Sequence, residues 1–148
     1  MDELDNQIVK ILNKDGRTNN KDIAKRLSVS EGTIRNRINK LLASGILKVS
    51  GLVNPDLAEE KQLMILGVNI SASKDLFAIA QEISKLPGVH SAYIVTGRYD
   101  LMIETWLDTK YGLIKFLSES LASIDGITST ESFLVMKNYK KWVLDSDI

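Results

Sequence analysis

The chain contains no cysteine. This absence excludes disulfides, thiolate zinc sites and cysteine nucleophiles, and it fits a reducing compartment. No apolar run approaches the roughly 20 residues that a membrane-spanning helix needs. Met1 is followed by the acidic Asp2 and Glu3, whereas a signal peptide opens with a basic segment. We therefore expect a cytoplasmic protein with no membrane partner.

Residues that commonly build metal and catalytic sites are equally scarce. His90 is the only histidine, and no acidic residue stands near it at the spacing of metal ligands. The sequence has no glycine-rich phosphate-binding motif and no convincing pair of nucleophile and base. We expect no catalytic site, no metal site and no cofactor, and hence a protein that is not an enzyme.

The formal net charge of zero hides an uneven distribution of charge along the chain. Residues 17–48 carry eight basic and two acidic residues, whereas residues 54–148 carry nine basic and thirteen acidic residues. A basic segment on an acidic body suits a polyanion such as DNA, because binding releases the counterions condensed on it. An ordinary solvated surface would show the same imbalance, so charge alone leaves both interpretations open.

Residues 1–45 predict three short helices around a small apolar core. Isoleucine and leucine recur at helical spacing in residues 2–15, 20–27 and 31–44. Each segment is preceded by a residue whose side chain can cap a helix: Asp2, Asn19 and Ser30. A short helix, a three-residue turn and a longer helix match the helix-turn-helix layout, in which the second helix of the pair enters the DNA major groove.

The polar side of residues 31–44 carries side chains suited to DNA. With Ile34 and Ile38 facing inward, asparagine, lysine and glycine point away from the core, and two arginines flank that face. Asparagine and arginine pair with adenine and guanine, whereas threonine and lysine suit phosphates. The predicted DNA-binding residues are Arg17, Lys21, Ser30, Gly32, Thr33, Asn36, Arg37 and Lys40. A structural helical bundle with a basic exposed face is the alternative.

The rest of the chain predicts an α+β domain. Residues 46–62 suggest a connecting strand over 46–53 followed by a polar linker. Residues 63–148 then predict the order βαββαβ of a ferredoxin-like fold. The predicted elements are strand 63–70, a helix over 73–86 capped by Ser73, strands 89–96 and 101–107, a helix opening at Thr109, and strand 127–136. Two helices cover only one face of such a sheet, so we expect self-association to bury the other.

Six short motifs occur in order along the chain. They are Leu4-Asp5-Asn6-Gln7-Ile8 with Asp15-Gly16-Arg17, Asp22-Ile23-Ala24-Lys25-Arg26-Leu27, Ser28-Val29-Ser30, Leu41 to Ile46, Leu86-Pro87-Gly88-Val89, and Thr96-Gly97-Arg98-Tyr99-Asp100. With them the chain resembles the Lrp/AsnC family of feast/famine regulators over essentially its whole length. The resemblance implies a winged-helix-like helix-turn-helix domain joined to a ferredoxin-like sensor domain. It also implies homodimers, assembled further into tetramers or octamers, with an effector, commonly an amino acid, bound between subunits.

Carried onto this chain, the resemblance assigns the effector site to two segments. One is the loop Gly97, Arg98, Tyr99 and Asp100, and the other, from a neighbouring subunit, is Thr128, Ser129 and Thr130. Loop amides could take a carboxylate, Asp100 an ammonium group, and the hydroxyls could bridge. Alternatively, Gly97 and Asp100 form only a hairpin turn that Asp100 caps.

We therefore expect a sequence-specific regulator that binds double-stranded DNA and responds to a small effector. A ligand-independent architectural protein that bends DNA is the alternative.

Overall fold

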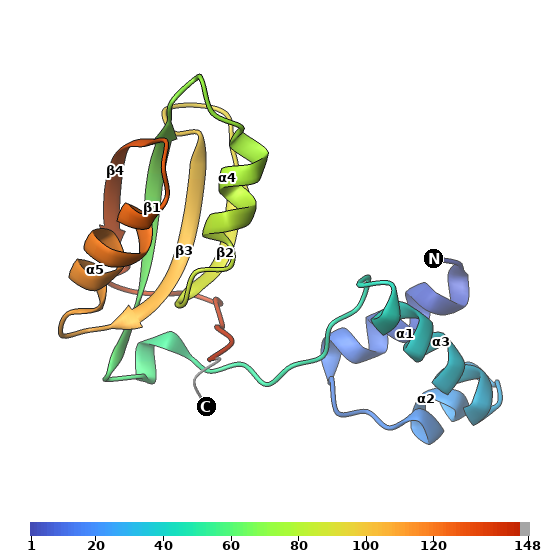
Figure 1. The fold of residues 1–148 in the computed structure, drawn as a ribbon. Helices are drawn as coiled ribbons and strands as arrows, with labels where there is room; N and C mark the ends of the chain where they lie inside the picture. Colours follow the sequence, from blue (N-terminus) through green and yellow to red (C-terminus); the bar gives the residue numbers. More distant parts are fainter. Residues whose placement is uncertain (146–148) are drawn as a thin grey trace. The chain divides into compact units, whose positions relative to one another are not determined.

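The computed structural model describes residues 1–145, which form two compact units joined near residue 51 (Figure 1). The first unit spans Met1–Gly51 and the second begins at Leu52. Each unit buries an apolar core of its own.

The first unit consists of three helices that share one small core. They are α1 (Glu3–Lys14), α2 (Asn20–Leu27) and α3 (Glu31–Ala43). Ile8, Ile23 and Ile34, one from each helix, are fully buried and pack together. Isolated helices of this length are marginal in water, so the shared core is what keeps all three in place.

The predicted helix starts are confirmed. The side chains of Asp2, Asn19 and Ser30 each accept a hydrogen bond from the backbone amide three residues later. At α1 the cap is reciprocal, because the Asp5 carboxylate also accepts from the amide of Asp2 at 3.1 Å.

The second unit has the predicted βαββαβ order. Among the described residues its strands are β1 (Lys61–Ile70), β2 (Val89–Ile94), β3 (Leu101–Asp108) and β4 (Ile127–Leu134). They form one antiparallel sheet in the order β2-β3-β1-β4. Its helices are α4 (Leu76–Ile83) and α5 (Gly112–Lys115), and α5 continues through a π-helical turn (Phe116–Ser120) into a 3-10 turn (Leu121–Ser123).

Helices α4 and α5 lie on the same face of this sheet (Figure 1). The main core forms between them and the central strands, where Leu66, Val68 and Ile103 are fully buried. Side chains alternate along a strand, so the neighbouring residues of β1 and β3 point to the opposite face.

That opposite face is covered at one end only. Leu63 and Trp106 pack there with Val143 of the C-terminal segment in a second cluster. Farther along the face, Tyr93 and Phe133 are each more than two fifths exposed. The face therefore presents partly exposed apolar and aromatic side chains that no helix covers.

Several boundaries after residue 45 differ from the sequence expectation. Residues 46–53 form no strand, and only Val53 pairs, through an isolated bridge to Val143. Asp75, and not Ser73, caps α4, because the Ser73 hydroxyl is engaged with that of Ser71 at 3.0 Å. Thr109 does not open a helix; its hydroxyl donates to the Glu60 carbonyl at 3.3 Å, and α5 starts three residues later. The last strand ends at Leu134, before Met136.

The C-terminal segment 137–145 clasps the residues that lead into β1. Val53 and Val143 exchange two backbone hydrogen bonds of 2.8 and 3.0 Å. The Asp145 carboxylate accepts from Lys61 Nζ at 2.9 Å and from Trp106 Nε1 at 3.3 Å. A short 3-10 turn, η1 (Pro55–Leu57), lies within this stretch. The residues up to 62 that follow the expected strand, predicted to form a polar linker, thus belong to the second unit.

Replacing Val143 should destabilise the second unit. Val143→Ala removes two buried methyl groups and leaves a small cavity, so we expect a loss of about 1–3 kcal/mol in unfolding free energy. Val143 is 1% exposed and Val49 is 49% exposed, so Val49→Ala is a matched control that should change little. Urea unfolding followed by tryptophan fluorescence measures both, and equal losses would contradict this account of the clasp.

Candidate DNA-binding and effector-binding sites

The outer face of α3 is polar and exposed, as predicted. Ile34 and Leu41 are buried in the core, whereas Asn36 and Lys40 lie on the exposed side. Gly32, in the first turn, is exposed as well. A backbone without a side chain there allows close approach of another molecule. This face has the groups and the access that a DNA-reading helix needs.

Ser30 and Thr33 serve first as the cap of α3. The Ser30 hydroxyl accepts from the Thr33 amide at 3.1 Å and lies 2.8 Å from the Thr33 hydroxyl. Both hydroxyls are therefore held at the start of the helix. Arg17 follows α1 and Lys21 lies in the first turn of α2, and both are exposed.

Arg37, predicted to meet base edges, contacts another helix of the same unit in this structure. Its Nη1 forms ion pairs with Asp2 and, at 3.2 Å, with Asp5 at the start of α1. Both ion pairs use Nη1, so they tether the guanidinium to the start of α1. The arginine that remains exposed on α3 is Arg35, which pairs with Glu31 one turn earlier at 2.8 Å.

These ion pairs shift the titration of both partners. The hydrogen bond from the Asp5 amide, followed by that from Arg37, lowers the pKa of Asp2. The hydrogen bond and charge of Asp2 raise the pKa of Arg37. The sequence identifies Asp2 and Asp5 only as residues at the start of α1, although both also bind Arg37 of α3. Their link to a residue more than thirty positions away has no local signal.

The predicted effector loop connects β2 and β3. It is closed by a hydrogen bond of 3.1 Å from the Val95 amide to the Asp100 carbonyl. Gly97 has a φ of +125°, a conformation that favours glycine and explains that residue type in the turn. The loop is exposed at Gly97 and Arg98.

Asp100 binds the protein's own backbone. Its carboxylate accepts a hydrogen bond from the Ile70 amide at 2.8 Å, where β1 ends. This contact ties the loop to the end of β1, and it differs from the cap of the hairpin turn that the sequence offered as the alternative.

The two predicted effector segments flank the same end of β1 within one chain. Thr128 Oγ1 donates to the Asn69 carbonyl at 3.1 Å, and the Asn69 amide group donates to Ser129 Oγ at 3.1 Å. Thr130 pairs with Val68, which on its other side pairs with Leu101. Since β1 is central, the loop before β3 and the start of β4 meet at one edge of the sheet.

Tyr99 lies on the sheet face opposite the helices. A Cβ atom at Gly67 would lie 2.6 Å from the Tyr99 ring, so the absence of a side chain at Gly67 makes room for the ring. The ring also meets Phe133 edge-on, with centroids 6.3 Å apart. Arg98 stands over the Tyr99 ring and lies 3.6 Å from the Glu131 carboxylate. The loop is therefore tied to β1 and β4 by its own side chains.

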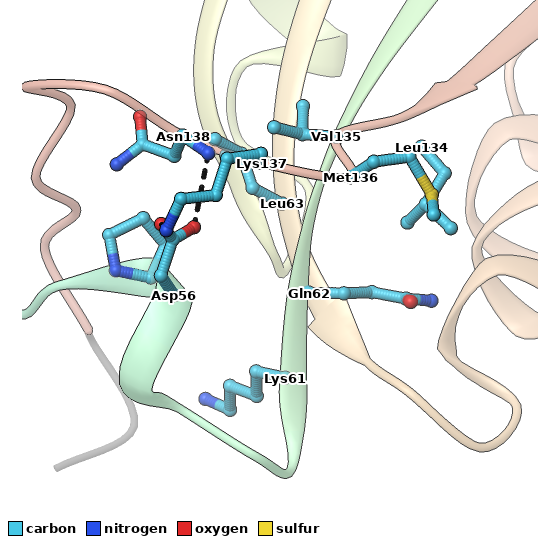
Figure 2. Close-up of a pocket in the computed structure, with 10 residues that line it drawn as sticks. Asp56, Lys61, Gln62, Leu63, Leu134, Val135, Met136, Lys137 and Asn138 are labelled. Carbon is cyan, nitrogen blue, oxygen red and sulfur yellow. Dashed lines mark hydrogen bonds and ion pairs between the residues drawn. The ribbon is translucent and has the colours of Figure 1, made fainter.

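A cavity of about 330 Å³ lies at the other end of the sheet, between the start of β1 and the end of β4 (Figure 2). Its polar groups bind one another: Asp56 accepts from Lys137 Nζ at 2.6 Å and from the Asn138 amide at 3.2 Å. Within residues 1–145, every buried side-chain nitrogen and oxygen has a partner. We therefore do not assign a ligand to this cavity.

Residues 1–145 contain neither a candidate membrane span nor a candidate metal cluster. No helix there is long and apolar enough to span a membrane. No group of three or more histidine, cysteine, aspartate or glutamate residues there could hold a metal ion.

Comparison with known families places both units. The family model for the AsnC-type helix-turn-helix domain matches residues 1–42. The family model for the Lrp/AsnC ligand-binding domain matches residues 63–142.

Individual proteins agree with these matches. A regulator of the helix-turn-helix type from Pyrococcus abyssi is 34% identical over 96% of this chain and 89% of its own. The regulatory protein AsnC of Haemophilus influenzae is 31% identical over 93% of each chain. The structure of E. coli AsnC has a TM-score of 0.72 at 29% identity, with 93% of each chain covered.

One further solved structure shares the fold. It is a transcriptional regulator from Neisseria meningitidis in complex with L-Met, with a TM-score of 0.77 at 24% identity, covering 96% of this chain and 94% of that one.

Removing the Asp100 carboxylate should loosen the end of β1. Asp100→Ala leaves the Ile70 amide without its acceptor, so we expect a loss of about 1–3 kcal/mol in unfolding free energy. Asp100→Asn keeps an acceptor oxygen and should lose less. Urea unfolding compares the two variants, and an alanine variant as stable as the wild type would show that water replaces the carboxylate.

Proposed function

Because the chain belongs to the Lrp/AsnC family of transcriptional regulators, we propose that α3 reads specific DNA and that the second unit binds an amino acid. In this proposal the effector changes the assembly of the protein or its affinity for DNA. A regulatory and non-enzymatic role is part of the same proposal, supported by relatives named as regulators.

The observation that carries the DNA-binding part is the exposed face of α3 within a matched helix-turn-helix domain. In the proposed complex Asn36 pairs with adenine in the major groove and Lys40 contacts a phosphate, and the exposure of both residues supports these roles. Arg17 and Lys21 add positive charge outside α3 and suit the phosphates of the duplex.

Self-association through the sheet supports the dimeric part of the proposal. The face opposite the helices leaves Tyr93 and Phe133 partly exposed. Burying such side chains against a second copy would remove them from water, and a two-fold dimer would carry two copies of α3. Such a pair of reading helices fits half-sites one or more helical turns apart.

The effector part rests on the Lrp/AsnC ligand-binding domain and on the loop that it contains. Loop amides at Gly97 and Arg98 are exposed and suit a carboxylate, and Asp100 presents its second oxygen to an ammonium group. Thr128, Ser129 and Thr130 are exposed hydroxyl groups at the same edge of the sheet. The fold neighbour solved with L-Met makes amino acids the first class of ligand to test.

Replacing Asn36 should weaken sequence-specific binding. We expect Asn36→Ala to cost about 1–3 kcal/mol on an operator selected from genomic fragments and little on random DNA. Asn13 is an exposed asparagine near the C-terminal end of α1 and provides the matched control. Asn13→Ala should change the affinity for neither DNA. Fluorescence anisotropy measures both affinities. Equal losses on operator and random DNA would reassign Asn36 to a phosphate contact.

An amino-acid effector should stabilise the native protein. A ligand present at 100 times its Kd adds about 2.7 kcal/mol to the stability of the state that binds it. In a thermal-shift screen of the standard amino acids, a small subset of them should therefore raise the Tm. Asp100→Asn should remove that shift, whereas Asp108→Asn, at the far end of β3, should retain it. If no amino acid raises the Tm, the ligand-independent architectural alternative is favoured.

A further inference from the structure

We propose that Arg37 is a positioning residue: it orients α3 through the two carboxylates at the start of α1 and reads no base itself. This inference rests on the proposed DNA-binding function and assigns a role to a residue on the reading helix. Arg37 would act on specificity without touching DNA.

The contacts divide the oxygens of the two aspartates between two tasks. In the reciprocal cap of α1, Asp2 Oδ1 accepts from the Asp5 amide at 3.0 Å and Asp5 Oδ2 accepts from the Asp2 amide at 3.1 Å. The other oxygen of each side chain, Asp2 Oδ2 and Asp5 Oδ1, faces Arg37 Nη1. The hydrogen bonds of the cap therefore hold both carboxylates independently of Arg37.

The position of Arg37 on α3 makes this contact a constraint on the reading face. Arg37 follows Asn36 directly and precedes Lys40 by three residues, and successive residues of a helix are rotated by about 100°. Holding Arg37 against α1 therefore fixes the direction in which Asn36 and Lys40 point. Ile34, three residues before Arg37 and therefore on the same side of the helix, is buried in the core, so α3 is held along this side by packing and by the ion pairs.

The burial of the contact also suits a structural link better than a DNA contact. The Asp5 side chain is 13% exposed and the Arg37 side chain 34% exposed. Two carboxylates beside one guanidinium leave no net positive charge for a phosphate. By contrast, Arg35 is 59% exposed and pairs only within its own helix.

Charge gives the two possible roles opposite signs. If Arg37 contacted a phosphate, neutralising the aspartates would free its charge and strengthen binding to any DNA. If Arg37 positions α3, neutralising the aspartates releases the helix and weakens binding to the operator alone.

The test uses the full chain and three variants: Arg37→Met, the pair Asp2→Asn with Asp5→Asn, and all three changes together. Asparagine keeps acceptor oxygens for the helix cap, and methionine keeps the apolar stem of the side chain. We expect the first two variants each to lose about tenfold in operator affinity, which corresponds to about 1.4 kcal/mol. The combined variant should lose no more than either, because all three changes break one link.

Two controls accompany these variants. Arg35→Met removes a neighbouring exposed arginine whose ion pair, with Glu31, lies within α3, and it should leave the operator preference of the protein largely intact. Arg37→Lys retains the charge and should recover part of the operator affinity. For Arg37→Met the affinity for random DNA and the dependence of log K on log salt should stay as in the wild type.

Three results would overturn the inference. Tighter binding by the asparagine pair, with a salt slope about one unit smaller for Arg37→Met, would assign Arg37 to a phosphate. A loss confined to Arg37→Met, with the asparagine pair unchanged, would assign it to a base. Unchanged operator affinity in all variants would mean that the contact of Arg37 with the two aspartates contributes only to stability.

Failure of the proposed function is distinguishable from these results. If the wild type prefers no DNA sequence, the proposed function fails, and the link is judged by NMR without DNA. Arg37→Met should then shift the amide resonances of Asn36 and Lys40 far more than those of α2, and equal small shifts would overturn the positioning role.

Discussion

The structure of the first unit depends on one constraint: three helices too short to persist alone must bury one face each in a common core. Ile8, Ile23 and Ile34 meet that constraint, and their burial decides which side of α3 is left in water. Asn36 and Lys40 are exposed because they lie on the side that the core does not use. Hydrophobic packing thus determines which face of α3 is exposed, and the polar side chains on that face are left in water.

In the second unit the central strand β1 has the corresponding role. It pairs on both sides, with β3 and with β4, so whatever lies at its end is contacted from two directions. The loop at Asp100 and the hydroxyl groups of residues 128–130 are both held there by bonds to Ile70 and Asn69. Residues far apart in the sequence therefore share one edge of the sheet because of strand order. The same strand, through Gly67, leaves room for the Tyr99 ring on the open face.

Local features were predictable from the sequence, and contacts between distant residues were not. The caps at Asp2, Asn19 and Ser30 involve residues three positions apart, and the βαββαβ order follows from periodicity and turn residues. The partner of Arg37 was missed because a helical wheel gives a direction but not the element that lies there. The bridge between Val53 and Val143 was missed for the same reason, since an edge-to-edge pairing leaves no pattern in either segment. At α4, Ser73 and Asp75 are both competent caps, and the serine hydroxyl is taken by Ser71.

If the proposed effector binds at the loop 97–100, the position of that loop limits how the effector could influence the first unit. The segment from the first unit enters β1 at Lys61, and the loop binds the same strand at Ile70, nine residues later. At about 3.3 Å per residue these points are roughly 30 Å apart along a strand that is paired on both sides. A ligand at the loop therefore has no short path to the linker. A strand that is hydrogen-bonded on both sides does not move independently of its neighbours. A change in how copies of the chain associate through the open face requires less internal rearrangement of the sheet. Tyr99 of the loop contacts Phe133 on that face, so the loop adjoins the surface through which copies would associate. On this view the effector alters DNA binding by favouring one assembly over another, to the extent that it binds one of them more tightly.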